Sequence, residues 1–152
     1  MTMTSIRRRK AVTGGVKVTN NIESFTQPAF VKTYTDVPGS FVGSKEHMGF
    51  EASEWKLVIK GEKADVMLGA MLKGDKSVLI YTESGKHGTE DFTSEHIMTG
   101  DIAREYSESK NGEPQTLTLT GQIKDYKWTQ NGKVITNVNI ENGDYFIDGV
   151  TY

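Results

Sequence analysis

The segment Thr99–Val150 constrains the fold more than any other part of the chain, because short β-type runs alternate in it with strong turn signals. Two blocks in this segment, TGDIAREY and TGQIKDY, share a Thr-Gly-x-Ile start followed by mixed charges and a tyrosine. Asn-Gly pairs that begin at Asn111, Asn131 and Asn142 close successive runs. Asn-Gly is a strong hairpin signal because both residues tolerate a positive φ. The pattern therefore predicts an antiparallel β meander.

The length and composition of the chain limit the size of its core. With 152 residues the chain has the size of one domain. Its hydrophobic fraction of 36% is low, although aromatic and β-branched residues are common enough to argue against disorder. We expect a thin sandwich or barrel, or a protomer that completes its core against neighbouring copies.

Charge, cysteine content and hydrophobic runs exclude several classes of protein. The formal net charge of −2 argues against a nucleic-acid-binding protein. The chain has no cysteine, which excludes disulfides and thiolate metal sites. No apolar run reaches the roughly 18 residues of a membrane span, and no apolar part of a secretory signal follows the basic residues near the N-terminus. The sequence predicts a protein without a membrane anchor that stays in the cytoplasm in which it is made.

The N-terminal segment, residues 1–15, is polar, basic at Arg7–Lys10 and closed by two glycines. We expect a flexible basic arm here. The basic run could contact a polyanion or an acidic neighbour, but it is short, and a solvated tail is the simpler interpretation. Residues 16–152 are expected to form a single β domain.

The central part of the chain contains the clearest strand and the one helix candidate. Apolar and charged residues alternate in Ser53–Lys60, a pattern typical of a half-buried strand. Glu62–Leu72 places valine, methionine and alanine at helical spacing. Ile22–Thr35 is an extended run in which Pro28 indicates an edge position or a bulge. The expected fold is mainly β, an antiparallel β-sandwich or partly open β-barrel of seven to nine strands with one packed α-helix.

The segment Asp36–Gly49 breaks the strand pattern and is predicted to be a long loop, residues 36–49. It combines a proline and three glycines with several apolar residues. A loop of this length inside a compact domain is usually functional or disordered, and the apolar content argues against disorder.

The sequence offers no catalytic constellation, and we expect neither an enzyme nor a cofactor. None of the three histidines lies at ligand spacing from another: His47, His87 and His96. There is no Gly-x-Ser-x-Gly elbow and no phosphate-binding glycine loop. Asp101, Glu105 and Asp125 could supply a carboxylate pair of the glycosidase type. Because charges alternate along the strand, the simpler interpretation is that these carboxylates lie on its solvent-exposed face.

Several elements, taken in order, resemble the tail tube proteins of contractile-tailed phages. They are the segment IESFTQPAF with its Glu-x-x-x-x-Pro pattern, the glycine-rich loop, the strand after it, the Gly-x-Ile blocks and the C-terminal IENGDYFIDGV. The likeness runs from Ile22 to Val150. It departs from the family pattern at VKVTNN, where the family's usual first strand and Asp-Gly turn are replaced, and at Tyr152, which closes the chain without a helical extension.

The resemblance implies a structural protein of the virion. Such proteins form homohexameric rings in which strands of six subunits close a shared barrel, and the rings stack into the inner tube of the tail. The implied partners are further copies of the chain, the tail sheath protein, the tape measure protein inside the lumen, and the baseplate and tail terminator proteins. DNA would be a transient, non-specific cargo during ejection into the host, and assembly would take place in the host cytoplasm.

Three other classes stay open at this point. The haemolysin-coregulated protein of type VI secretion is similar in fold and forms comparable rings. A ligand-binding β-barrel module would need an apolar pocket lined by Trp55, Tyr126 and Trp128. A small β-fold hydrolase would need a carboxylate pair in a cleft.

The resemblance also implies two assembly surfaces. A polar strand face should line the lumen, and its candidates are Glu54, Lys56, Asp101, Glu105, Gln122 and Lys124. The apolar residues of the predicted loop would be exposed at a cost in a lone monomer, because burying one Phe or Val side chain stabilises by about 1.5–3 kcal/mol. We therefore expect the loop to contact the next ring through Val37, Pro38, Phe41, Val42 and Met48.

Overall fold

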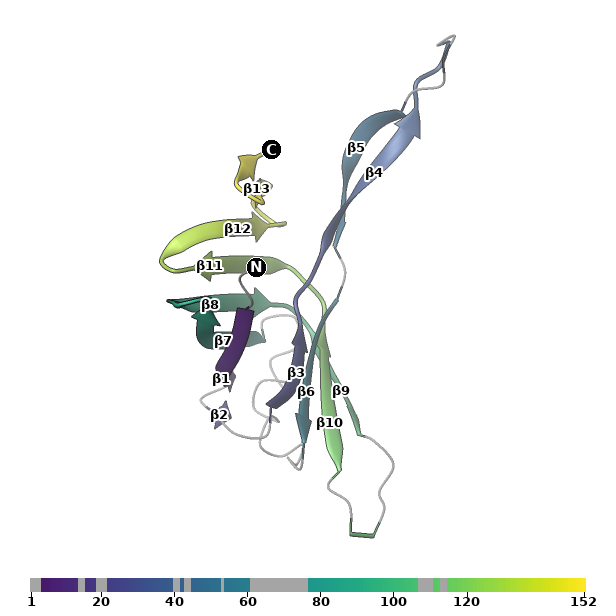
Figure 1. Ribbon diagram of the computed structural model, residues 1–152. Coiled ribbons are helices and arrows are strands. Elements are labelled where there is room, and N and C mark those ends of the chain that lie inside the picture. Colours follow the sequence, from purple (N-terminus) through teal and green to yellow (C-terminus); the bar gives the residue numbers. More distant parts are fainter. Residues whose placement is uncertain are drawn as a thin grey trace.

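The computed structural model of the chain describes residues 4–13, 16–18, 22–39, 42, 45–52, 54–60, 77–106, 111–112 and 115–152. These residues form fourteen strands in three antiparallel sheets (Figure 1). The expected mainly β, antiparallel fold is thereby confirmed. No helix occurs in the described part of the chain, and the predicted helix Glu62–Leu72 lies outside it and stays a prediction.

The largest sheet has eight strands, and its order along the sheet differs from the order in the chain. From one edge to the other it contains β14 (Val150–Thr151), β13 (Asp144–Ile147), β12 (Lys133–Asn139), β11 (Asp125–Gln130), β8 (Glu90–Thr99), β7 (Val78–His87), β1 (Thr4–Thr13) and β2 (Val16–Val18). Its strands β11 to β14 form the later part of the predicted β meander, whereas the earlier part, Ile102–Tyr106 and Thr116–Gly121, belongs to another sheet.

The two smaller sheets come from the middle of the chain. The four-stranded sheet runs in the order β3 (Ile22–Thr26), β6 (Trp55–Lys60), β10 (Thr116–Gly121) and β9 (Ile102–Tyr106). The third sheet is a hairpin of β4 (Phe30–Asp36) and β5 (Lys45–Ala52).

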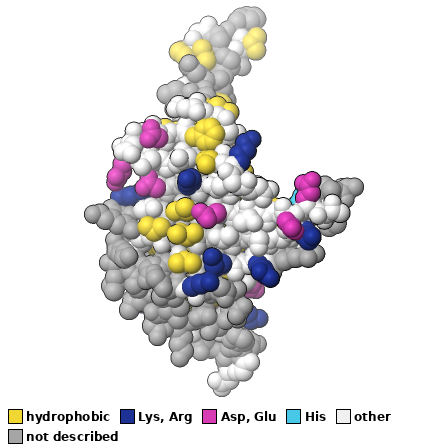
Figure 2. Space-filling view, turned by 90° about the vertical axis from the view of Figure 1, so that its left-hand side faces the viewer, with side chains coloured by type: hydrophobic (Ala, Val, Ile, Leu, Met, Phe, Trp, Pro, Cys, Tyr) yellow, Lys and Arg dark blue, Asp and Glu magenta, His cyan; other side chains and the backbone are white. Residues whose placement is uncertain are grey.

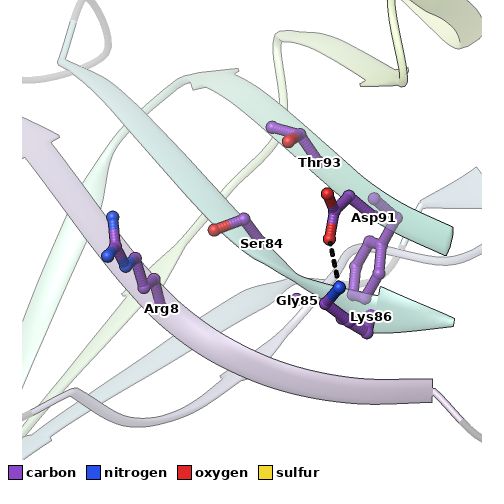
Figure 3. A pocket seen from close by; sticks show the side chains of 7 residues that line it. Arg8, Ser84, Gly85, Lys86, Asp91 and Thr93 are labelled. Atoms are coloured by element: carbon purple, nitrogen blue, oxygen red, sulfur yellow. Dashed lines mark ion pairs between the residues drawn. The ribbon is translucent and has the colours of Figure 1, made fainter. Parts of the chain in front are cut away.

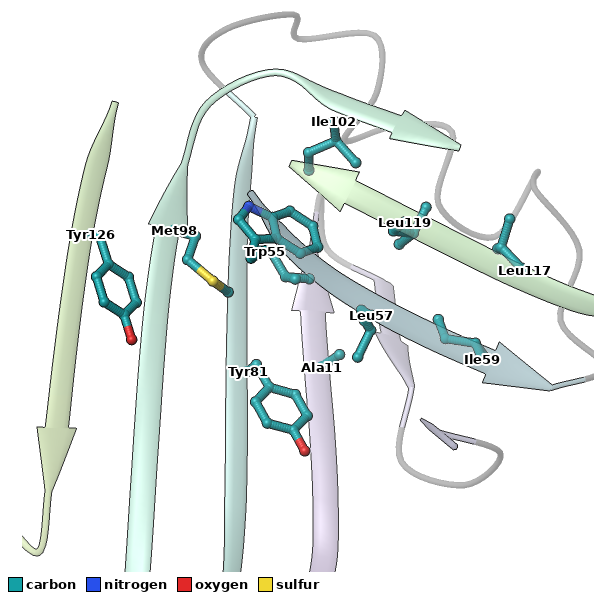
Figure 4. Close-up of a cluster of buried hydrophobic side chains, with 11 residues drawn as sticks. Ala11, Trp55, Leu57, Ile59, Tyr81, Met98, Ile102, Leu117, Leu119 and Tyr126 are labelled. Carbon is teal, nitrogen blue, oxygen red and sulfur yellow. The ribbon is translucent and has the colours of Figure 1, made fainter. Parts of the chain in front are cut away.

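The eight-stranded and four-stranded sheets pack face to face around the core (Figure 4). The large sheet contributes Ala11, Leu79, Tyr81, Met98 and Tyr126. The small sheet contributes Trp55, Leu57, Ile59, Leu117 and Leu119. The architecture is therefore the predicted β-sandwich, and in the described part of the chain neither sheet closes into a barrel.

The largest core side chain, that of Trp55, occupies space that a glycine leaves free. Trp55 on β6 lies opposite Gly121 on β10. A Cβ atom added to Gly121 would lie 2.0 Å from Nε1 of the indole. The strand pairing therefore depends on the absence of a side chain at this position.

The structure places Thr4–Thr13, which were expected to belong to a flexible N-terminal arm, in a strand. These residues form β1, which pairs with β7 from Thr4 opposite His87 to Thr13 opposite Leu79. The basic run does not prevent this because β side chains alternate between two faces. Arg8 and Lys10 are exposed, whereas Ala11 is completely buried in the core.

The predicted loop 36–49 is shorter than expected, because β4 ends at Asp36 and β5 begins at Lys45. The pairing of these strands shifts between Thr33 and Tyr34, and such a bulge interrupts the alternation that a strand prediction relies on. Pro28, where the sequence indicated an edge position or a bulge within one run, instead separates β3 from β4, which belong to different sheets. The predicted number of seven to nine strands was too low because β1 and β5 were not predicted and because several expected runs are each divided into two strands.

Candidate assembly surfaces

The outward face of the four-stranded sheet is polar. Leu117 and Leu119 point into the core, so that the residues between them along β10 point away from it. The cross-strand register extends this face over the neighbouring strands: Thr118 lies opposite both Val58 and Glu105, and Thr120 lies opposite Lys56. The polar residues of this face, here called the threonine face, are Ser24, Thr26, Lys56, Lys60, Glu105, Thr116, Thr118 and Thr120.

The predicted lumen residues fall into two places. Lys56 and Glu105 belong to the threonine face. Asp101, Gln122 and Lys124 lie where the chain passes between the eight-stranded and four-stranded sheets, and Glu54, just before β6, contacts Gln122 there. The threonines were not predicted as part of this surface, although the alternation of threonine and leucine in TLTLTG of β10 indicates that the threonines share one face.

The residues at the sheet crossing are held together by hydrogen bonds. The Gln122 side-chain amide donates to Glu54 Oε1. The backbone N–H of Gln122 donates to the carbonyl of Asp101 at 2.9 Å, and that of Lys124 to the carbonyl of Thr99 at 2.8 Å. These contacts fix the end of the threonine face relative to the eight-stranded sheet.

The β4–β5 hairpin projects beyond the sandwich (Figure 1), and several of its apolar side chains are exposed. Val31 is 60% exposed and Val42 is 75% exposed, and Val37 and Pro38 are exposed as well. Figure 2 shows hydrophobic side chains on this projection and others scattered among mixed charges on the body. Of the remaining predicted contact residues, Phe41 lies outside the described residues, and Met48 is in β5 with a side chain that is not described.

Two aromatic contacts join the hairpin base to the eight-stranded sheet. The Phe30 ring stacks on Tyr126 with a centroid distance of 5.9 Å. The Phe50 ring meets Tyr152 edge-on at 4.9 Å. Aromatic pairs in these geometries stabilise beyond the area they bury, so that the base of the hairpin is anchored while its far end extends from the body.

A histidine lies among the aromatic rings between the sheets. His96 is 2% exposed, and its Nδ1 is hydrogen-bonded to the Tyr126 hydroxyl at 2.7 Å. Its ring is nearly parallel to that of Trp128, with centroids 5.5 Å apart, and Phe25 lies 5.1 Å away. Burial lowers the pKa of His96 to about 4 because the protein interior disfavours the charged imidazolium. Burial likewise raises the pKa of Tyr126.

The arrangement does not favour the hydrolase or the ligand-binding module. Glu105 lies in the four-stranded sheet and Asp125 in the eight-stranded sheet. Asp101 and Glu105 are four residues apart along an extended chain, roughly 13 Å, which is wider than the carboxylate pairs of glycosidases. Trp55 and Tyr126 are 1% and 2% exposed and belong to the hydrophobic core between the sheets.

A depression of about 350 Å³ lies over β1, β7 and β8 (Figure 3). Arg8 and Ser84 line it, together with an ion pair in which Lys86 Nζ and Asp91 Oδ1 are 3.2 Å apart. Both partners of this pair are largely in solvent, where such pairs contribute little. Within the described residues, no group of three or more acidic or histidine side chains is placed to bind a metal ion. No helix in that part of the chain is long and apolar enough to span a membrane.

A sandwich with one polar sheet face and a projecting apolar hairpin has the surfaces of an assembly protein. A family model for phage tail tube protein FII matches residues 4–152 of the chain. The chain therefore belongs to the phage tail tube protein FII family, which confirms the resemblance seen in the sequence. The family is structural and not enzymatic, and the chain is a component of a phage tail that assembles with itself and with other tail proteins.

Two solved structures are similar to this chain at low sequence identity. One is described as a type six secretion system protein and matches with a TM-score of 0.51 and 16% identity over 87% of this chain and 91% of that one. Another is the baseplate of the anti-feeding prophage, with a TM-score of 0.46 and 6% identity over 80% of this chain and 91% of that one. Comparison with curated proteins gives no match.

Proposed function

We propose that six copies of the chain form a ring, and that rings stack head to tail into the inner tube of a contractile tail. The tube would guide DNA into the host during ejection. The observation that carries the proposal is an open four-stranded sheet with a polar outward face, in a chain of the tail tube family.

The threonine face is the surface that we assign to the bore. If each of six copies contributes its four strands, about 24 strands close a barrel with a backbone radius of roughly 24 Å and a bore of roughly 40 Å. Such closure removes the free edges at β3 and β9, which would otherwise invite unspecific pairing. Threonine hydroxyls and charges of both signs give the bore a hydrated surface of mixed charge, which does not attract DNA strongly.

The projecting hairpin is the surface that we assign to the contact between rings. Its apolar side chains lie far from the core, and six hairpins in a ring would repeat the contact six times. The same placement leaves the outward face of the eight-stranded sheet on the outside of the tube, where the sheath would surround it. The tape measure protein would occupy the bore before DNA, and the baseplate and terminator proteins would meet the first and last rings.

Electron microscopy of concentrated, purified protein tests the proposed function. Rings or rods with a central channel support it, and a map of such rods would place the threonine face directly. A strictly monomeric protein at high concentration, with and without a nucleating baseplate, would contradict it.

The hairpin assignment predicts that Val42→Ser shortens tubes without destabilising the monomer. Val42 is 75% exposed, so the melting temperature of the dilute protein should be unchanged, within about 0.5 kcal/mol in stability. Tube length, measured on micrographs, should fall markedly, and Phe41→Ala should act in the same way. Ile140→Ser, an exposed apolar change on the body, is the matched control. A lower melting temperature with tubes of normal length would mean that the hairpin packs on its own subunit.

The bore assignment predicts that Glu105→Lys slows genome passage several-fold while tubes still form. Six added lysines per ring would attract the phosphate backbone to the wall. The measurement is the time from adsorption to genome entry for particles that carry the variant. Glu141→Lys, an exposed change in the β12–β13 turn, is the control. If the variant folds normally but forms no tubes, Glu105 lies in a subunit contact and not in the bore.

A further inference from the structure

The Asn-Gly turns of the chain are held in different ways. In the β11–β12 turn, the backbone N–H of Asn131 donates to the Thr93 carbonyl at 2.9 Å, and the Asn131 side-chain Oδ1 accepts from the Thr93 N–H at 2.9 Å. Asn131 also has a positive φ of 52°. Asn131 is thus held to Thr93 of β8 by two hydrogen bonds, one from its backbone and one to its side chain.

The β12–β13 turn holds Asn142 by its backbone alone. The N–H of Asn142 donates to Asn139 Oδ1 at 3.0 Å, and Asn142 is exposed. Among the described residues, no hydrogen bond restrains its side-chain amide. A Cβ added to Gly143 or to Gly132 would meet no atom within 4 Å, so the two turns differ in the side-chain hydrogen bond of the asparagine and not in the space around the glycine.

An asparagine followed by glycine can lose ammonia without an enzyme. The backbone nitrogen of the glycine, after losing its proton, attacks Cγ of the asparagine side chain. The Cγ–Nδ2 bond breaks, Nδ2 leaves as ammonia, and a cyclic succinimide remains. Water then opens either carbonyl of the ring, which gives aspartate or isoaspartate. Glycine favours the attack because it has no Cβ to crowd the nitrogen.

We propose that Asn142 is a site of spontaneous deamidation in the folded protein and that Asn131 is protected. Ring closure at Asn131 must first break the Thr93 hydrogen bond to Oδ1 and distort a turn whose backbone is tied to β8. One such hydrogen bond corresponds to about a tenfold difference in rate. Ring closure at Asn142 breaks no hydrogen bond of the side chain.

The modification would act on the C-terminal strands. Either product adds a negative charge, and isoaspartate also lengthens the backbone within the turn that leads into β13. The strand after it, β14, precedes Tyr152, which contacts Phe50 at the base of the projecting hairpin. Ageing of the particle would thus alter the region that anchors the hairpin.

The test compares the Asn-Gly sites in one sample. The folded protein is kept at mildly alkaline pH and about 37 °C, below the melting range of mesophile domains of roughly 45–65 °C, and digests are taken at intervals. Mass spectrometry with electron-transfer fragmentation then separates aspartate from isoaspartate. We expect Asn142 to react at least about tenfold faster than Asn131. Asn111 provides an exposed Asn-Gly reference in the same digest.

Two controls separate the fold from the local sequence. In denaturant, all the Asn-Gly sites should react at similar rates, because the dipeptide is the same. Asn142→Ser should abolish the product at this turn and leave the rate at Asn131 unchanged. Equal rates at Asn131 and Asn142 in the folded protein would overturn the proposal, as would an Asn142 that reacts in denaturant but not in the folded chain.

Discussion

Gly121→Ala should be among the most destabilising single substitutions in the chain. The new methyl group would lie 2.0 Å from the Trp55 indole, and neither group can move away easily because both strands are paired across the sheet. We expect a loss of about 3 kcal/mol, at the upper end of the cost of overpacking. For a domain of this size, the melting temperature should fall by about 10 °C. Dilute protein should be used, since assembly would add to apparent stability.

A double-mutant cycle with Trp55→Phe tests the physical cause. The smaller ring leaves room for a methyl group, so that Gly121→Ala should cost clearly less in the Trp55→Phe background. Thr120→Ala, the neighbouring change on the outward face, should cost less than about 1 kcal/mol. Equal costs of Gly121→Ala in both backgrounds would show that the indole is not the obstacle.

Stability should decrease as the pH falls through the range in which His96 would take up a proton in the unfolded chain. The pKa of His96 is lowered from 6.5 to about 4 in the folded protein. The neutral ring therefore contributes its full stability above pH 6.5, and this contribution is lost as the pH falls toward 4. The loss over the window is about 3 kcal/mol.

Urea titrations at several pH values measure this loss. His96→Phe removes the titrating group and should flatten the dependence between pH 6.5 and 4, even if its stability at neutral pH is lower. His87→Gln, a change at an exposed histidine, should leave the slope as in the parent protein. If the His96→Phe protein and the parent lose stability in parallel, acid sensitivity comes from other groups.

Local turn chemistry and strict alternation account for the parts of the fold that the sequence predicted. Asn131 has the positive φ that its Asn-Gly signal requires, and β6 shows the alternation of buried and exposed residues expected for Ser53–Lys60. β1 was missed because its arginines suggested a solvated tail, and its partner strand β7 is distant in the sequence. Pairing between distant segments leaves little trace in either segment alone.

The candidate surfaces were predicted in part. Lys56 and Glu105 could be assigned to one polar face because charged residues alternate with buried ones. The threonines of β10 were not assigned to this face from the sequence, since a threonine suits a strand whether it faces solvent or a partner. The predicted loop does contain Val37, Pro38 and Val42, but its second part, with Met48, belongs to β5, whose pairing with β4 is interrupted by a shift in register.

The path of the chain between the sheets has a consequence for folding. The chain leaves the eight-stranded sheet after β2 and again after β8, and it returns to that sheet at β7 and at β11. Strand β1 pairs with β7, which is synthesised much later. Neither sheet is built from a continuous segment: all strands of the four-stranded sheet precede Gln122, whereas the eight-stranded sheet needs the chain up to Thr151. Unfolding should therefore be a single cooperative transition, folding should be slow for the length of the chain, and the eight-stranded sheet cannot be completed until nearly all of the chain has left the ribosome.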